Sequence, residues 1–123
     1  LPGLAALRIP LGLAPGRIHG LARRQGETAR TRPYLCSAVR HEETVTLQLP
    51  EGSTVQALPP PADFARGALS YQARYTFSGG TLTTTRTFTA RRSGPTCEPE
   101  EDRLWEAFRK VLVRDLRGQV FLR

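Results

Sequence analysis

Strict alternation of apolar and polar residues marks the first predicted strand, over residues 44–49. Val45, Leu47 and Leu49 fall on one face, and threonine and glutamine residues separate them. This period of two is typical of a strand that buries one face. A turn containing proline and glycine ends the strand. Residues 54–58 then predict a short second strand, which stops at three consecutive prolines.

The strongest local signal is a hairpin around Gly79 and Gly80, flanked by residues 70–77 and 81–90. Counting outward from the glycines sorts the side chains into an apolar row and a polar row. A slip of one residue would mix the two rows, so the sorting itself supports this register. The predicted pairs of the apolar row are Phe77 with Leu82, Tyr75 with Thr84, Ala73 with Arg86, Tyr71 with Phe88, and Leu69 with Ala90.

Arg86 is the one charged residue in the apolar row, opposite Ala73. A guanidinium on a core face needs a carboxylate or several carbonyl oxygens to satisfy it. We keep three interpretations, in falling order of preference: an arginine that reaches water at the margin of the sheet, a buried structural ion pair, and a ligand-binding arginine. The candidate partners are Glu42, Glu43 and Glu106.

A helix of about four turns is predicted over residues 99–115. Proline and then three acidic residues open it, and its apolar positions recur at helical spacing around Trp105 and Phe108. Residues 119–122 predict a short closing strand. The fold class is therefore mainly β: a small antiparallel β-sandwich or curled sheet with one C-terminal amphipathic helix.

Residues 1–33 show neither the alternation typical of a strand nor the apolar spacing typical of a helix. Prolines and glycines interrupt the apolar first half, and the second half is polar and basic. We interpret residues 1–33 as a linker or lead-in from an upstream domain, and residues 34–123 as an accessory β-domain. Because the sequence contains no methionine, we expect it to be a piece of a longer protein. No apolar run approaches the roughly 20 residues of a membrane-spanning helix.

The net charge of +7 and a pI near 10.7 raise the question of polyanion binding. The basic residues are spread from Arg8 to Arg123, in clusters no larger than a pair, and Lys110 is the only lysine. This distribution disfavours nucleic acid as a partner. An anionic-polymer or nucleic-acid binding module is kept as an alternative function.

Catalytic chemistry has few candidates. The histidines are His19 and His41, and we interpret both as solvated surface residues. Cys36 lies close to His41 in the sequence, but such proximity rarely creates a nucleophile–base pair. Carboxylates near residue 100 are explained by the positive end of the helix. We predict no enzymatic activity for this chain, no metal site and no cofactor.

The two cysteines, Cys36 and Cys97, are far apart in the sequence and belong to no metal-binding motif. Cys36 lies just before the first strand, and Cys97 lies between the hairpin and the helix. They are either a disulfide or two unrelated thiols, and placement at the edges of one small sheet favours the disulfide.

The polar row of the hairpin is rich in threonine, which is a favoured residue on the solvated side of a strand. A free-standing carbohydrate or peptide recognition domain is a second alternative function. Such a domain would need an exposed aromatic platform, whereas the register commits Tyr71, Tyr75, Phe77 and Phe88 to the core face.

Several short motifs occur in an order that resembles the C-terminal β-domain, a domain of unknown function, of bacterial transglutaminase-like proteins. The resemblance covers roughly residues 30–123. The motifs are Arg30 to Pro33, Leu49-Pro50-Glu51-Gly52, Leu58-Pro59, Leu69-Ser70-Tyr71, Gly80-Thr81-Leu82-Thr83, Thr85-Arg86-Thr87-Phe88 and Leu104 to Phe108.

The resemblance implies a non-catalytic role beside a central domain of papain-type fold, which holds the family's catalytic Cys, His and Asp. No position of this chain matches those three residues. The implied partners are the upstream domain of the same polypeptide and its protein or peptide substrate. The resemblance also implies a periplasmic location, where a disulfide would persist.

Overall fold

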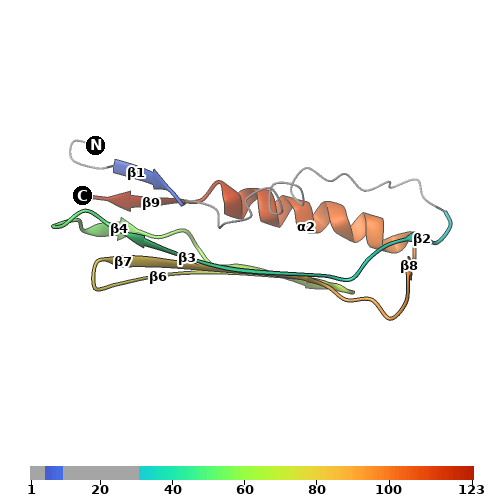
Figure 1. Ribbon diagram of the computed structural model, residues 1–123. Helices are drawn as coiled ribbons and strands as arrows, with labels where there is room; N and C mark the ends of the chain where they lie inside the picture. The colour runs from blue at the N-terminus through green and yellow to red at the C-terminus, as the bar shows by residue number, and fades with distance from the viewer. Residues whose placement is uncertain (1–4, 10–30) are drawn as a thin grey trace.

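A computed structural model describes residues 5–9 and 31–123 of the chain (Figure 1). In chain order the elements are β1 (Ala5–Arg8), β2 (Tyr34–Leu35), β3 (Val39–Gln48), β4 (Val55–Ala57), β5 (Ala62–Arg66), β6 (Leu69–Ser78), β7 (Thr81–Ala90), β8 (Thr96–Cys97), α2 (Glu100–Leu116) and β9 (Gln119–Leu122). The predicted class is confirmed: the chain is mainly β, its sheets are antiparallel, and one helix lies in its C-terminal region.

The main sheet has four antiparallel strands in the order β3-β7-β6-β5. Its centre is the predicted hairpin, and the predicted register is confirmed, with Tyr71 opposite Phe88 and Ala73 opposite Arg86. Gly79 and Gly80 have φ values of 59° and 79°, which is the left-handed conformation that a two-residue hairpin turn requires.

Two features of the main sheet go beyond the predicted strands. Strand β3 begins at Val39 and pairs with β7 along its whole length. Strand β5 follows the three prolines directly and forms an edge of the sheet. Its only buried side chain is Phe64, so its sequence shows little of the alternation by which strands are recognised.

Helix α2 packs on the inner face of this sheet and closes the core (Figure 1). The ring of Phe108 stacks on that of Phe88 with centroids 4.8 Å apart, and Trp105 meets Phe88 edge-on. Aromatic pairs in these geometries add to the stabilisation that comes from burial alone. The buried cluster is Phe64, Leu69, Tyr71, Ala73, Phe88, Ala90, Trp105, Phe108 and Leu112.

A second, three-stranded sheet in the order β1-β9-β4 continues the layer of the helix (Figure 1). Its centre is β9, the predicted closing strand, whose Val120 is fully buried. The segment that we interpreted as a lead-in contributes β1, since Ala5–Arg8 pairs with all four residues of β9. Residues 1–4 and 10–30 of that segment lie outside the described residues.

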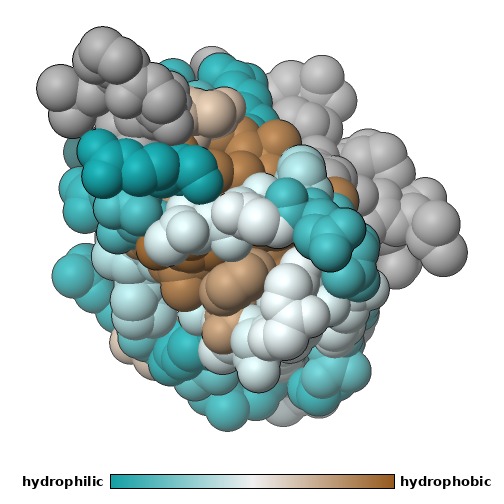
Figure 2. Space-filling model, turned by 90° about the vertical axis from the view of Figure 1, so that its left-hand side faces the viewer, coloured by the Kyte–Doolittle hydropathy of each residue, from teal (hydrophilic) through white to brown (hydrophobic). Residues whose placement is uncertain are grey.

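The main sheet is thus covered partly by the helix and partly by the small sheet. The second layer of the predicted sandwich therefore consists of both a helix and strands. At the end of the molecule that faces the viewer in Figure 2, apolar side chains show at the surface between more polar ones. Phe121 of β9 is 37 % exposed. No helix among the described residues is long and apolar enough to cross a membrane.

Candidate functional site

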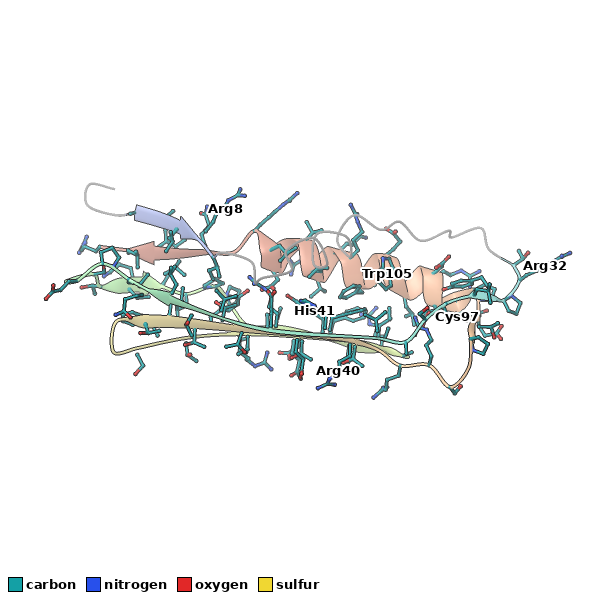
Figure 3. All side chains as sticks on the ribbon, viewed as in Figure 1. Arg8, Arg32, Arg40, His41, Cys97 and Trp105 are labelled. Atoms are coloured by element: carbon teal, nitrogen blue, oxygen red, sulfur yellow. A yellow bond between two sulfur atoms is a disulfide. The ribbon has the colours of Figure 1, made fainter. Side chains whose placement is uncertain are left out.

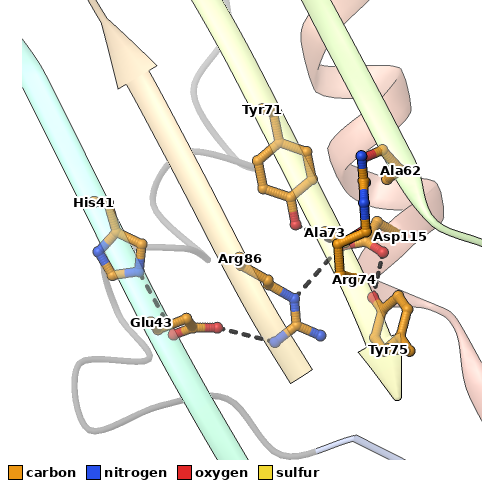
Figure 4. Close-up of polar contacts among 9 residues, drawn as sticks. All are labelled: His41, Glu43, Ala62, Tyr71, Ala73, Arg74, Tyr75, Arg86 and Asp115. Atoms are coloured by element: carbon orange, nitrogen blue, oxygen red, sulfur yellow. Dashed lines mark hydrogen bonds and ion pairs between the residues drawn. The ribbon is translucent and has the colours of Figure 1, made fainter. Parts of the chain in front are cut away.

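A cluster of polar side chains lies inside the molecule, between the main sheet and the last turn of α2 (Figure 4). Arg86 of β7 is at its centre and is 2 % exposed. Its position follows from the alternation of β7, which directs every second side chain, from Leu82 to Ala90, toward the core. An arginine at such a position must find its partners inside the protein.

Two carboxylates from different elements satisfy this guanidinium. Its NH1 group donates a hydrogen bond of 2.9 Å to Glu43 on β3, and Nε lies 3.4 Å from Asp115 on α2. Glu43 is therefore the partner among the three glutamates considered. Glu42 points to the outer face and pairs with Arg40 at 2.6 Å.

Asp115 also accepts hydrogen bonds from the hydroxyl groups of Tyr71 and Tyr75, one at each carboxylate oxygen. Burial, followed by the charge of Asp115, raises the pKa of Tyr71. Burial, followed by the hydrogen bond to Asp115, raises the pKa of Tyr75 in the same direction. Both hydroxyls therefore stay protonated and act as donors over the physiological pH range.

The pKa of Arg86 reflects opposing effects. Burial lowers it, while the hydrogen bond with Glu43 and the nearby tyrosines and Asp115 raise it, and the net direction is upward. Arg86 thus keeps its positive charge inside the protein. A buried ion pair of this kind fixes the position of one element on another, and its groups are not free for a substrate.

His41 lies at the β3 side of this cluster and is 6 % exposed. Its Nε2 atom is 3.5 Å from Oε2 of Glu43, and neither ring nitrogen has a hydrogen-bond partner among the described residues. Figure 4 shows the ring beside Glu43 on the same strand. His41 is therefore a core residue of the sheet, which rules out the surface position expected of a solvated histidine.

The two cysteines form a disulfide at the opposite end of α2, where the two-residue strands β2 and β8 meet (Figure 3). Nε of Arg92 lies 3.1 Å from the sulfur of Cys36, and the same guanidinium pairs with Glu101 at 2.7 Å. Cys36, Cys97 and Glu101 are close enough together to bind a metal, but the disulfide removes the two thiolates such a site would need. We interpret the group as a structural clasp.

No nucleophile–base pair occurs among the described residues. Cys36 is bonded to Cys97, and the nearest partner found for His41 is Glu43. His19 lies outside the described residues. The outer face of the main sheet presents threonines from β7 between polar residues of its neighbours, and no aromatic side chain joins them there.

Sequence reasoning located Arg86, Glu43 and the two cysteines, and it missed Asp115, Arg92 and Glu101. The helical spacing contained a usable signal for Asp115. It follows Leu104, Phe108, Val111 and Leu112 along the inner stripe of α2, and an acidic residue on that stripe would have identified the second partner of the inward arginine.

These features define a class: a small domain of antiparallel strands and one helix, held together by a disulfide and a buried ion cluster. The model of the DUF3858 family, a domain of unknown function with a solved structure, matches residues 12–122. The chain therefore belongs to that family. No protein with curated function matches the sequence.

A similar solved structure is the crystal structure of a "putative protease" from Parabacteroides distasonis ATCC 8503, with a TM-score of 0.71 and 19 % sequence identity. The match covers 99 % of this chain and 24 % of that protein. At this identity the similarity shows the fold alone. This chain spans about a quarter of the length of the Parabacteroides protein.

Proposed function

We propose that this domain is a non-catalytic accessory module of a larger transglutaminase-like bacterial protein of papain-type fold. The observation that carries the proposal is the coverage of the structural match. Nearly the whole chain, 99 %, is similar to only 24 % of a protein described as a "putative protease". A fold that recurs as one quarter of a larger protein is suited to act beside other domains.

The buried polar residues pair within the domain, which is consistent with a structural role beside another domain. Arg86 pairs with both Glu43 and Asp115 inside the domain. The disulfide joins the segment just before β3 to strand β8, which lies just before α2. Both devices hold the helix on the sheet. A rigid domain of this kind can support the upstream catalytic domain, shape access to its cleft, or contact its protein or peptide substrate.

The disulfide also supports an extracytoplasmic location, because such bonds persist in the periplasm and are rare in the cytosol. The sequence motifs that resemble transglutaminase-like proteins suggest the same location. The proposed partner is therefore a catalytic domain that precedes this one in an exported polypeptide.

The first test is to read the coding region upstream of Leu1. The proposal expects an in-frame domain with a Cys, a His and an Asp of transglutaminase type. A second test compares the full polypeptide with a variant that lacks residues 34–123, by incorporation of a labelled amine into casein and by cleavage of casein. The isolated domain should show neither activity, and the deletion should lower the activity of the full polypeptide.

Two results would overturn the proposal. One is turnover by the isolated domain that survives purification and is lost in a point variant of that domain. The other is a coding region that contains no catalytic domain at all.

A further inference from the structure

The outer side of α2 carries a row of cations at its C-terminal end. Lys110, Arg114 and Arg117 are all exposed and lie at helical spacing, so the row extends about 10 Å along the axis. None of the three forms an ion pair or side-chain hydrogen bond with a described residue, in contrast to Arg40, Arg74, Arg86 and Arg92. We call these three residues the cationic face.

Helix electrostatics account for only part of this face. Cations in the last turn are stabilised by the negative end of the helix dipole, and this applies to Arg114 and to Arg117 at the C-cap. Lys110 lies a full turn earlier, where the effect has largely decayed. The three cations also line one shared hollow, of about 440 Å³, together with Arg109 and Val113.

A second hollow, of about 330 Å³, adjoins the cationic face through Arg114. Its walls are mainly apolar: Pro59, Pro60 and Pro61 on one side, and Val111 and Gly118 on the other. Gly118 is needed for this shape, because a Cβ there would come within 3.0 Å of Pro59. We call this hollow the proline pocket.

The charges around the proline pocket are not balanced. Asp63 at its rim is paired with Arg74 at 2.8 Å, and Asp115 is occupied by Tyr71, Tyr75 and Arg86. Arg114 is the lining charge that has no partner among the described residues. The pocket therefore offers an apolar cavity with one available positive charge at its edge.

We propose that the cationic face and the proline pocket together bind an acidic peptide segment of a partner protein, with one apolar side chain of that segment in the pocket. Guanidinium groups recognise carboxylates with matching fork geometry. An apolar anchor that is flanked by charged contacts is a common arrangement in peptide recognition. The inference rests on the proposed accessory role, since it names the surface through which that role would act.

Two other occupants agree less well with the surface. A phosphate polymer would use the cations but would leave the apolar pocket empty. A second copy of this chain would bring together two molecules that each carry a net charge of +7, which opposes association.

The test is fluorescence polarisation of the whole 123-residue chain with a fluorescein-labelled peptide, Gly-Glu-Asp-Leu-Asp-Glu-Gly, and with the same peptide carrying Ser in place of Leu. We expect at least tenfold tighter binding of the Leu peptide. Arg114→Glu should weaken that binding at least tenfold. Arg91→Glu, which makes the same charge change at an exposed residue outside the face, should change it less than twofold.

The proposal is overturned if the Leu and Ser peptides bind equally, or if Arg91→Glu weakens binding as much as Arg114→Glu. Either result would show general attraction to a basic protein. Tighter binding of a 20-nucleotide single strand that depends on Arg114 would assign the face to a phosphate polymer. If sedimentation shows a dimer of the natural sequence, and Arg114→Glu is a monomer, the cationic face binds a second copy of the chain.

Circular dichroism melts of each variant show whether it folds, and exposed substitutions of this kind should leave the fold intact. Failure of peptide binding is distinguishable from failure of the accessory role. The accessory role is tested by the deletion in the full polypeptide, which does not depend on where the partner binds.

Discussion

Tyr71 and Asp115 are 44 positions apart in the sequence and are joined by a hydrogen bond. The tyrosine hydroxyl, near the start of β6, donates to Oδ2 of the aspartate in the last turn of α2. The same carboxylate receives Tyr75 from the same strand and Arg86 from the next. A single helical side chain thus binds three side chains of the sheet, which fixes how far along the sheet the helix lies.

Replacing Tyr71 with Phe should lower the free energy of unfolding by about 1–3 kcal/mol, because a buried carboxylate oxygen loses a donor that water cannot replace. The ring and its packing against Phe108 are retained. Urea denaturation measures the change, and Thr87→Ala on the outer face is the control. A loss below 0.5 kcal/mol would mean that the hydroxyl contributes nothing to stability.

Replacing Arg86 with Met should cost about 3–5 kcal/mol, since it removes the positive charge that compensates the buried carboxylates of Glu43 and Asp115. Arg74→Met is the matched control. Arg74 pairs with Asp63, but both side chains are about half exposed, and exposed pairs are worth less than about 1 kcal/mol. Similar losses in the two variants would contradict the structural role given to the cluster.

The raised pKa of Tyr71 predicts a loss of stability in alkali. In the unfolded chain Tyr71 ionises near its ordinary pKa of 10.0, whereas in the folded chain it keeps its proton to higher pH. Stability is therefore fully present below pH 10 and falls as the pH rises above it, by about 1.4 kcal/mol per pH unit for one such group. The urea midpoint measured between pH 9 and 12 tests this.

The Tyr71→Phe variant provides the comparison for the alkaline experiment. Its stability should start lower at pH 9 and should fall less steeply above pH 10, because one linked proton is missing. Parallel curves for the two proteins would show that other groups cause the alkaline unfolding.

The hairpin register was predictable because its determinants are local. Gly79 and Gly80 fix the turn, and the alternation of β6 and β7 fixes the faces. The second partner of Arg86 was not predictable in this way, because Asp115 comes from another element and the match depends on how the helix lies across the sheet. The same holds for β1, whose four residues become a strand only because β9 offers a free edge.

Removing the disulfide should destabilise the domain by about 4 kcal/mol, because the bond closes a loop of 61 positions in the unfolded chain. The variant Cys36→Ser with Cys97→Ser keeps side chains of similar size. Its unfolding should not respond to a reducing agent, whereas that of the natural sequence should. Thiol titration should first show that the reductant has fully reduced the natural sequence. If the reduced and oxidised proteins are then equally stable, the prediction is contradicted.

The division of the hairpin into a buried and a solvated face gives the clearest contrast between neighbouring residues. Phe88 is fully buried and stacks on Phe108, while Thr87 lies on the outer face between Glu42 and Gln72. Phe88→Ala should therefore cost about 3–5 kcal/mol by leaving a cavity, and Thr87→Ala well under 1 kcal/mol. The denaturant slope should be the same for both variants if each remains two-state.

Equal, small effects at the two positions would contradict the register itself. A slip of one residue in β7 would exchange the two faces, so that the threonine row would pack against α2 and Arg86 would point to solvent. The pair of variants thus tests the placement of the whole buried ion cluster, because Arg86 reaches Asp115 only if Phe88 occupies the core.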